Sequence, residues 1–356
     1  MTELLVGTKK GLFVLEGDTA TGFEVTARAF AGEPVEFALR DPASGHLLAA
    51  VTNAFYGPKL HYATDANGEW EQATGVALPD GGGQALERLW VIVPGADGTL
   101  YMGGDPGVLF TSADGGASWE LVRSLWEHPT RPDWQPGGGG LCLHSIAPWP
   151  GEPDRLALAM SAVGVWLTDD GMRSWRHGND GIRPRYLPED AGPTINLCVH
   201  DLHRAARRAE RMFMQFHGGV YRSDDAGASW TDIGTGLPSD FGFPMVLDPA
   251  DPDSAYVIPL AADMDRVTPG GVVRVYETRD AGATWTARGD GLPDEHAYLT
   301  VLRQAFDRAG EGDGLELYFG ATSGALFASG DAGGSWSAVA EHLPPVYSVR
   351  TTAESA

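Results

Sequence analysis

The stretch that decides the fold is Tyr221-Arg222-Ser223-Asp224-Asp225-Ala226-Gly227-Ala228-Ser229-Trp230. Asp225 is placed to accept hydrogen bonds from nearby backbone N–H groups, and Gly227 takes a positive φ at no steric cost, so we expect a tight turn. The Gly-Val-Tyr that ends at Tyr221 reads as a short strand, and Trp230 begins the next strand as a large apolar residue. One copy predicts one β-hairpin.

The same turn recurs along the chain, and we call it the repeated turn. Close copies occupy Ser112–Trp119, Thr278–Trp285 and Ser329–Trp336. Looser copies occupy Thr168–Trp175, Thr64–Trp70 and, in badly eroded form, Glu16–Phe23. The first of these looser copies has Met172 at the glycine position. In the second we expect Asn67 to take the left-handed conformation, because Asn replaces Gly there most readily.

The spacing of the copies predicts the architecture. Each copy ends on an aromatic residue: Phe23, Trp70, Trp119, Trp175, Trp230, Trp285 and Trp336. Successive members of this series lie 47, 49, 56, 55, 55 and 51 residues apart. A repeat of about fifty residues that holds several short strands is typical of one propeller blade. The sequence therefore predicts an all-β fold, a seven-bladed β-propeller.

The pattern Ser/Thr-x-Asp-x-Gly-x-Ser/Thr-Trp resembles the Asp box of the bacterial-neuraminidase-repeat superfamily. Its members include sialidases, xyloglucan-active glycoside hydrolases, sortilin-type receptors and photosystem II assembly propellers. The resemblance covers nearly the whole chain. It implies that the repeated turns are Asp-box turns between the third and fourth strands of each blade, with a structural role away from the active face. It implies little about activity, because one fold hosts many functions.

Strand counting predicts how the ring closes. Each repeat reads as four strands, A to D, with A innermost, but the first repeat lacks its strand A. One strand, Pro345–Arg350, is left over at the other end. We predict that it becomes the innermost strand of the first blade, which removes a free sheet edge. The expected domain is one propeller over residues 1–350, with residues 351–356 frayed. The other predicted inner strands are Val35–Arg40, Arg88–Val93, Cys142–Ala147, Cys198–His203, Phe243–Leu247 and Tyr298–Arg303.

Composition limits the class of partner. The 356 residues are 43% apolar, enough for a large core, and the even repeat favours one closed domain. A formal net charge of −23 argues against nucleic acid, which needs a basic surface. The N-terminus shows no signal-peptide pattern, no stretch is long enough to span a membrane, and two cysteines give no disulfide framework. We expect an acidic cytoplasmic protein without membrane partners.

Three long connections point to one face of the propeller as the binding face. Residues 122–140 and 177–196 join strand D of one blade to strand A of the next, and residues 260–271 join strands B and C of the sixth repeat. D–A and B–C connections emerge on the same face of a propeller. Long ordered loops on a rigid scaffold usually carry binding. We expect a small molecule or a partner protein to bind there.

A Cys-x-His pair begins two neighbouring inner strands: Cys142 with His144, and Cys198 with His200. His217 ends strand B of the fifth repeat and should approach His200. Three interpretations are open. Cys142, His144, Cys198 and His200 bind a zinc-like divalent metal; His144, His200 and His217 act as acids, bases or donors toward a ligand; or all are buried core residues.

Other polar and aromatic residues are candidates on the same face. Asp105 is the best acidic candidate for catalysis, because it precedes a strand at the position equivalent to His217. Arginine binds carboxylates and phosphates through its forked donors, and Arg303 is the strongest of these because it is predicted on an inner strand. The candidate ligand-binding residues are Arg185, Tyr186, Gln215, Phe241, Arg266 and Arg303.

The sequence does not support sialidase activity. Sialidases are six-bladed and hold the substrate carboxylate with three arginines, the first in an Arg-Ile/Leu-Pro motif that is missing here before the second repeated turn. Two hypotheses remain. The chain is a binding propeller with a histidine-containing pocket for a small anionic or sugar-like ligand or a partner, or it is a glycoside hydrolase or lyase that acts through His144, His200 and His217.

Overall fold

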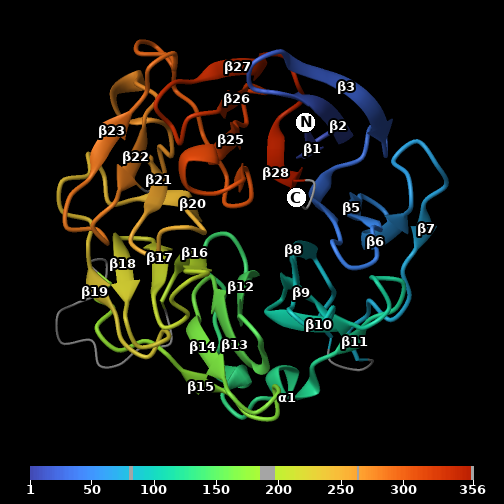
Figure 1. Cartoon of the computed structure of the whole chain (residues 1–356). Helices are drawn as coiled ribbons and strands as arrows, with labels where there is room; N and C mark the ends of the chain where they lie inside the picture. The colour runs from blue at the N-terminus through green and yellow to red at the C-terminus, as the bar shows by residue number, and fades with distance from the viewer. Residues whose placement is uncertain (80–82, 185–196, 263, 354–356) are drawn as a thin grey trace.

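A computed structural model describes residues 1–79, 83–184, 197–262 and 264–353. The strands of these residues form seven four-stranded antiparallel sheets arranged around a central axis (Figure 1). The predicted all-β, seven-bladed propeller is confirmed. Each inner strand packs against the inner strand of the next blade all the way round, so the ring is closed. Among the described helices, none combines the length and the apolar character needed to cross a bilayer.

The blades follow the order of the chain, with the innermost strand given first in each. Blade 1 is β28 (Val346–Ala353), β1 (Thr2–Thr8), β2 (Gly11–Asp18) and β3 (Gly22–Ala29); blade 2 is β4 (Val35–Arg40), β5 (Leu47–Asn53), β6 (Gly57–Ala63) and β7 (Glu71–Gln72). Blade 3 is β8 (Arg88–Pro94), β9 (Leu100–Asp105), β10 (Val108–Ser112) and β11 (Glu120–Leu121); blade 4 is β12 (Leu143–Trp149), β13 (Glu152–Met160), β14 (Gly164–Thr168) and β15 (Arg176–His177). Blade 5 is β16 (Val199–Arg204), β17 (Met212–Phe216), β18 (Gly219–Ser223) and β19 (Thr231–Asp232); blade 6 is β20 (Gly242–Leu247), β21 (Ala255–Pro259), β22 (Val275–Thr278) and β23 (Thr286–Arg288). Blade 7 is β24 (Phe306–Ala309), β25 (Glu316–Gly320), β26 (Leu326–Ser329) and β27 (Ser337–Ala340). Short helices occupy connections: α1 (Arg123–Trp126), η1 (Arg131–Asp133), η2 (Pro269–Gly271) and η3 (Gly312–Gly314).

The C-terminal strand closes the ring as predicted. β28 pairs antiparallel with β1, and Figure 1 shows this red strand beside the blue N-terminal strands. The strand runs through Ala353, three residues beyond the expected end, so residues 351–353 are not frayed. The backbone N–H of Thr351 donates to Asp307 Oδ2 of blade 7 at 2.8 Å, and this bond holds the extension in place. Residues 354–356 lie outside the described residues.

The repeated turn is held by one aspartate. Asp225 Oδ1 accepts from the Ser223 hydroxyl and from the Ser229 N–H, both at 2.8 Å, and Asp225 Oδ2 accepts from the Ser229 hydroxyl at 2.6 Å. Gly227 has the expected positive φ of 91°, and Ala226 before it is also left-handed, at 65°. Asn67 does not take that conformation, contrary to the prediction. In its shorter turn the Asn67 N–H instead donates to Asp65 Oδ1 at 2.8 Å.

The inner strands share an irregularity in strand pairing near their first residues. In five blades one extra residue interrupts the pairing of the inner strand with strand B: Glu36, Trp90, His144, His200 and Tyr347. In blade 6 two residues, Phe243 and Pro244, lie opposite the single residue Ile258. A β-bulge of this kind re-aims a side chain, and bulges are frequent beside functional sites. The bulges give six of the seven blades an out-of-register side chain at the same level of the ring.

Blade 7 differs from the prediction at this level. Residues Tyr298–Arg303 are not its inner strand, which is β24, beginning at Phe306. A turn takes the place of the bulge. In this turn the Ala305 N–H donates to the Leu302 carbonyl oxygen at 3.0 Å. Arg303 therefore sits in a turn just before the strand, and its side chain is released from the strand alternation.

The core lies between the blades. Neighbouring sheets share apolar clusters, such as the one that joins Leu167 of blade 4 to Met212 and Leu202 of blade 5. Packing between the inner layers is tight: a Cβ added to Gly103 of β9 would lie 2.4 Å from the Leu143 carbonyl oxygen of blade 4. This rigid packing fixes the positions of the residues that meet at the axis.

Candidate functional site

The out-of-register side chains of four blades meet at the axis. The rings of Trp90 and His144 lie 6.5 Å apart, and those of His200 and Phe243 lie 4.9 Å apart. Arg303 of blade 7 reaches between them, with its guanidinium carbon 5.7 Å from the Trp90 ring centre and 4.7 Å from that of Phe243. We call Trp90, Cys198, His200, His217, Phe243 and Arg303 the axial site.

Arg303 carries a charge that the rest of the described chain does not pair. Its Nε is buried and has no hydrogen-bond partner in that part of the chain. Burial lowers the pKa of the guanidinium, while the charge of Asp201 and the thiols of Cys142 and Cys198 oppose the shift. An arginine stays protonated in proteins, so a positive charge stands at the axis.

The residue after Arg303 ties opposite blades together. The side-chain amide of Gln304 donates to the His144 carbonyl oxygen of blade 4 at 2.8 Å. Arg350 of blade 1 donates to the Gln304 carbonyl oxygen at 2.9 Å. Gln304 is almost fully buried. These bonds hold the turn that carries Arg303 in a fixed position relative to blades 1 and 4.

Three potential metal ligands meet in blade 5. The ligand atoms of Cys198, His200 and His217 all lie within 4.8 Å of one another. His200 is buried, whereas Cys198 and His217 are partly exposed. Burial and the charge of Arg303 lower the pKa of His200 well below its usual value, so this imidazole is neutral at neutral pH. The group differs from the predicted set, because His217 joins it and Cys142 and His144 do not.

His144 is bonded within the protein through both ring nitrogens. Its Nε2 donates to the Val199 carbonyl oxygen at 2.9 Å and lies 3.1 Å from Ser161 Oγ, and its Nδ1 lies 3.0 Å from Ser145 Oγ. The ring is fully buried, and burial lowers its pKa to about 3. The predicted triad of His144, His200 and His217 is therefore not one cluster. The rings of His200 and His217 lie 5.2 Å apart, whereas His144 is neutral and links blades 4 and 5.

Asp105 and Cys142 form a separate pair at the border of blades 3 and 4. The Cys142 thiol donates to the Gly139 carbonyl oxygen at 3.1 Å and lies 3.5 Å from Asp105 Oδ2. Burial raises the pKa of the Asp105 carboxyl, and it raises the pKa of the Cys142 thiol strongly. Asp105 therefore contacts the first Cys-x-His pair, and it is not one of the clustered ligands.

The other predicted ligand-binding residues fall into different environments. The buried Gln215 amide donates to the carbonyl oxygens of Phe216, Gly219 and Asp240, so its donors hold the β17–β18 turn. Phe241 is 1% exposed and packs edge-on against the rings of His200 and His217, both at 5.2 Å. It forms a wall behind the imidazoles.

Arg266 is exposed and lies near the axial site, with its guanidinium carbon 5.7 Å from the Phe243 ring centre. Arg185 and Tyr186 lie outside the described residues. Sequence reasoning missed Trp90 and Gln304. Trp90 was detectable, because it follows Arg88 by two residues just as His144 follows Cys142 and His200 follows Cys198.

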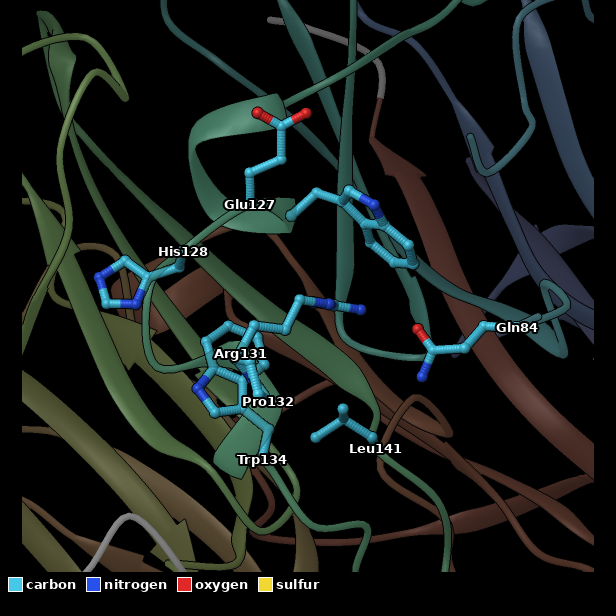
Figure 2. Close-up of a pocket in the computed structure, with 8 residues that line it drawn as sticks. Gln84, Glu127, His128, Arg131, Pro132, Trp134 and Leu141 are labelled. Atoms are coloured by element: carbon cyan, nitrogen blue, oxygen red, sulfur yellow. The ribbon is translucent and has the colours of Figure 1, made fainter. Parts of the chain in front are cut away.

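A hollow of about 450 Å³ lies beside the 122–140 connection. Figure 2 shows its lining residues: Gln84, Trp126, Glu127, His128, Arg131, Pro132, Trp134 and Leu141. The guanidinium of Arg131 stacks 3.8 Å above the Trp126 ring and donates to the carbonyl oxygens of Pro106 and Gly107 at 2.7 and 2.9 Å. The Trp134 indole donates to Thr130 Oγ1 at 3.1 Å. Arg131 thus holds the connection against the turn between β9 and β10, and the two tryptophans pack within the connection itself.

The site therefore belongs to a seven-bladed β-propeller. Comparison with protein families and with curated proteins gives no match. Solved structures with the same architecture include apo AztD from Citrobacter koseri, at 14% identity and TM-score 0.57, with 99% of this chain and 98% of that chain covered. YCF48 bound to D1 peptide is 12% identical, with TM-score 0.52 and coverage of 89% and 84%. An ancestral GH74 enzyme is 17% identical, with TM-score 0.54, 83% of this chain and 36% of that chain.

These likenesses concern the fold alone. The chain spans about a third of the GH74 enzyme chain but most of the AztD and YCF48 chains. One of the three proteins is an enzyme and another is bound to a peptide, so the architecture does not choose among functions. The function has to be argued from the axial site.

Proposed function

We propose that this propeller binds a small anionic ligand, a carboxylate or phosphate, at the axial site. The observation that carries the proposal is the buried Nε of Arg303, which has no hydrogen-bond partner in the described residues. Leaving a buried donor of a charged group unsatisfied is costly, and an arginine presents a fork of donors that matches carboxylate and phosphate oxygens. A bound anion satisfies both needs at once.

The surroundings of Arg303 favour an anion over a neutral ligand. Trp90 and Phe243 contact the guanidinium through their rings, which leaves its donor edge for a ligand. The negative charge that acts on Arg303 is that of Asp201, whose carboxylate already accepts from the Ser145 hydroxyl at 3.1 Å and from the Met245 N–H at 3.0 Å. Arg266, near the same Phe243 ring, adds a second positive charge. Two arginines thus lie at the axial site of a chain with a formal net charge of −23.

The test compares two arginine substitutions that remove the same charge. Thermal unfolding is measured with inorganic phosphate, sulfate, acetate and succinate for the wild type, Arg303→Gln and Arg207→Gln. Arg207 is an exposed arginine paired with Glu311 at 2.9 Å, on the A–B connection of blade 5. We expect at least one anion to raise the unfolding temperature of the wild type and of Arg207→Gln but not of Arg303→Gln.

The free energy of unfolding of an Arg303→Met variant without ligand distinguishes an anion-binding role of Arg303 from a structural role. Arg303 is half-buried and its buried Nε has no partner in the described residues, so replacing it by an apolar side chain of similar length is expected to stabilise the ligand-free protein. A structural arginine gives the opposite sign. Equal stabilisation of Arg303→Gln and the wild type by every anion refutes the proposal.

A further inference from the structure

We infer that Cys198, His200 and His217 form a zinc site with three protein ligands. The three ligand atoms come from one blade: Cys198 and His200 flank the first residue of β16, and His217 follows β17. A backbone bond from the His217 N–H to the Cys198 carbonyl oxygen, at 3.0 Å, sets the two segments side by side. Their ligand atoms lie within 4.8 Å of one another together with that of His200. The inference concerns the metal alone and does not depend on the proposed anion.

The tautomer of His200 suits a metal ligand. Its Nδ1 lies 2.7 Å from the Gly242 carbonyl oxygen of blade 6. Because a carbonyl only accepts, Nδ1 carries the proton, and the lone pair is on Nε2. Histidine ligands of metals usually donate their other N–H to a carbonyl or carboxylate in this way, which fixes the ring and its tautomer. Phe241 and Phe243 pack against the same ring and hold its plane.

The spacing of the three ligand atoms is close to the spacing of ligands around a tetrahedral zinc ion. Zinc bonds of ~2.0–2.3 Å separate neighbouring ligand atoms by ~3.3–3.8 Å, so the largest present separation of 4.8 Å has to shorten by ~1 Å. Cys198 and His217 are partly exposed, while His200 is buried and is held through its Nδ1. The third ligand is His217. The sequence grouped it with His144 and His200 as an acid, base or donor, but not with the predicted metal ligands.

The donor types select the ion. One thiolate and two imidazoles suit zinc, whereas magnesium and calcium prefer oxygen ligands. Three protein ligands leave one tetrahedral position for water or an external ligand, which is the arrangement of reactive or exchanging zinc sites.

Blade 4 provides an internal comparison for this site. It has the same Cys-x-His pair, but the residue equivalent to His217 is Ser161, whose N–H donates to the Cys142 carbonyl oxygen at 2.9 Å as the His217 N–H donates to that of Cys198. Its thiol donates to Gly139 and faces Asp105, and both nitrogens of its His144 are bonded within the protein. The cysteine at 142 therefore serves as a matched control for the one at 198.

The experiment measures metal binding by the full chain in buffer free of phosphate and carboxylates. Metal-free protein is titrated with Zn²⁺ against a chromophoric chelator, and with Co²⁺, whose thiolate charge-transfer absorption reports a Cys ligand. We expect one equivalent bound by the wild type and by Cys142→Ser. We expect affinity lower on the order of 100-fold for His217→Gln, and loss of the charge-transfer absorption for Cys198→Ser.

Three results would overturn the inference: no zinc bound by the wild type at micromolar concentration, equal affinity of His217→Gln and the wild type, or a loss in Cys142→Ser as large as that in Cys198→Ser. Because His217 is partly exposed, its variant should fold, and its unfolding temperature without metal is measured alongside. Arg303→Gln is titrated as well. Retained zinc binding together with lost anion binding in that variant shows that the two proposals stand or fall separately.

Discussion

The indole Nε1 of Trp230 donates a 2.9 Å hydrogen bond to the carbonyl oxygen of Gly178, 52 residues earlier and in the preceding blade. Trp285 makes the equivalent bond to Ile233 at 2.7 Å. Trp119, by contrast, bonds Gly116 within its own turn, also at 2.9 Å. The repeated turn therefore does more than join two strands. In blades 5 and 6 its tryptophan fastens one sheet to the one before it.

A Trp230→Phe substitution tests this fastening. It removes the bond to Gly178 and part of a buried ring, and we expect a loss of about 1–3 kcal/mol in the free energy of unfolding. The Gly178 amide, which donates to Val165 at 2.9 Å, should lose protection in hydrogen exchange. Trp119→Phe should cost similar stability but leave the exchange of Gly178 unchanged. Equal protection of Gly178 in both variants would contradict the assignment.

The aspartates of the repeated turns predict acid sensitivity. Hydrogen bonds from the Ser174 hydroxyl and N–H lower the pKa of Asp170 to about 2. An unfolded aspartate titrates near ~3.9, so the stabilisation is complete above that pH and is lost as the pH falls through the folded value. Asp170→Asn should be less stable than the wild type at neutral pH and nearly equal at pH ~2.

Urea unfolding across that range measures the difference between the two proteins. The neighbouring Asp169 makes an exposed ion pair with Arg176 at 3.6 Å, whereas the bonds from Ser174 go to Asp170. Asp169→Asn removes the same charge and should keep nearly all of the wild-type stability at neutral pH. A stability gap between Asp170→Asn and the wild type that does not narrow in acid would rule out the linkage.

Local chemistry made most of the fold predictable. Ser223, Asp225 and Gly227 lie within five residues and form their turn from their own hydrogen bonds, so each copy of the pattern reports one blade. Counting strands was then enough to assign β28 to blade 1. The end of that strand was not predictable, because it depends on the bond from Thr351 to Asp307 in another blade.

The candidate site was predictable only in part, because bulges break the alternation of side chains. Cys142 and His144 were expected to bind one metal together, but the extra residue in β12 is His144 itself. It turns toward Val199 in the next blade, and Cys142 faces Asp105. Arg303 was predicted at the axis for the wrong reason, since a turn and not a strand places it there. Sequence patterns do not encode such long-range registers.

Ring closure predicts complementation by a detached strand. A chain of residues 1–344 lacks β28, and blade 1 then exposes the unpaired edge of β1 at the axis. We expect this chain to lose the cooperative unfolding of the intact protein, and a peptide of residues 345–353 to restore it by pairing with β1. The same peptide with Val349→Asp should fail, because Val349 is fully buried. Calorimetry of the mixtures measures the outcome. Full cooperativity without the peptide would show that β28 does not close the ring.

The buried imidazole of His144 predicts how the free energy of unfolding depends on pH at values above those where the aspartates titrate. Burial lowers its pKa to about 3, whereas an unfolded histidine titrates near ~6.5. Between these values only the unfolded state binds the proton, so the stability from this residue is complete above pH ~6.5 and falls as the pH drops, by up to ~1.4 kcal/mol per pH unit. His144→Gln, which keeps a donor for the Val199 carbonyl, should be less stable at neutral pH but show a shallower loss of stability from pH 6.5 to 5. Urea unfolding at several pH values measures the slopes, and the ring proton signals of His144 should not shift over the same interval. A shift with a midpoint near pH 6.5 would mean that the ring is open to water and would make His144 available again as an acid or base.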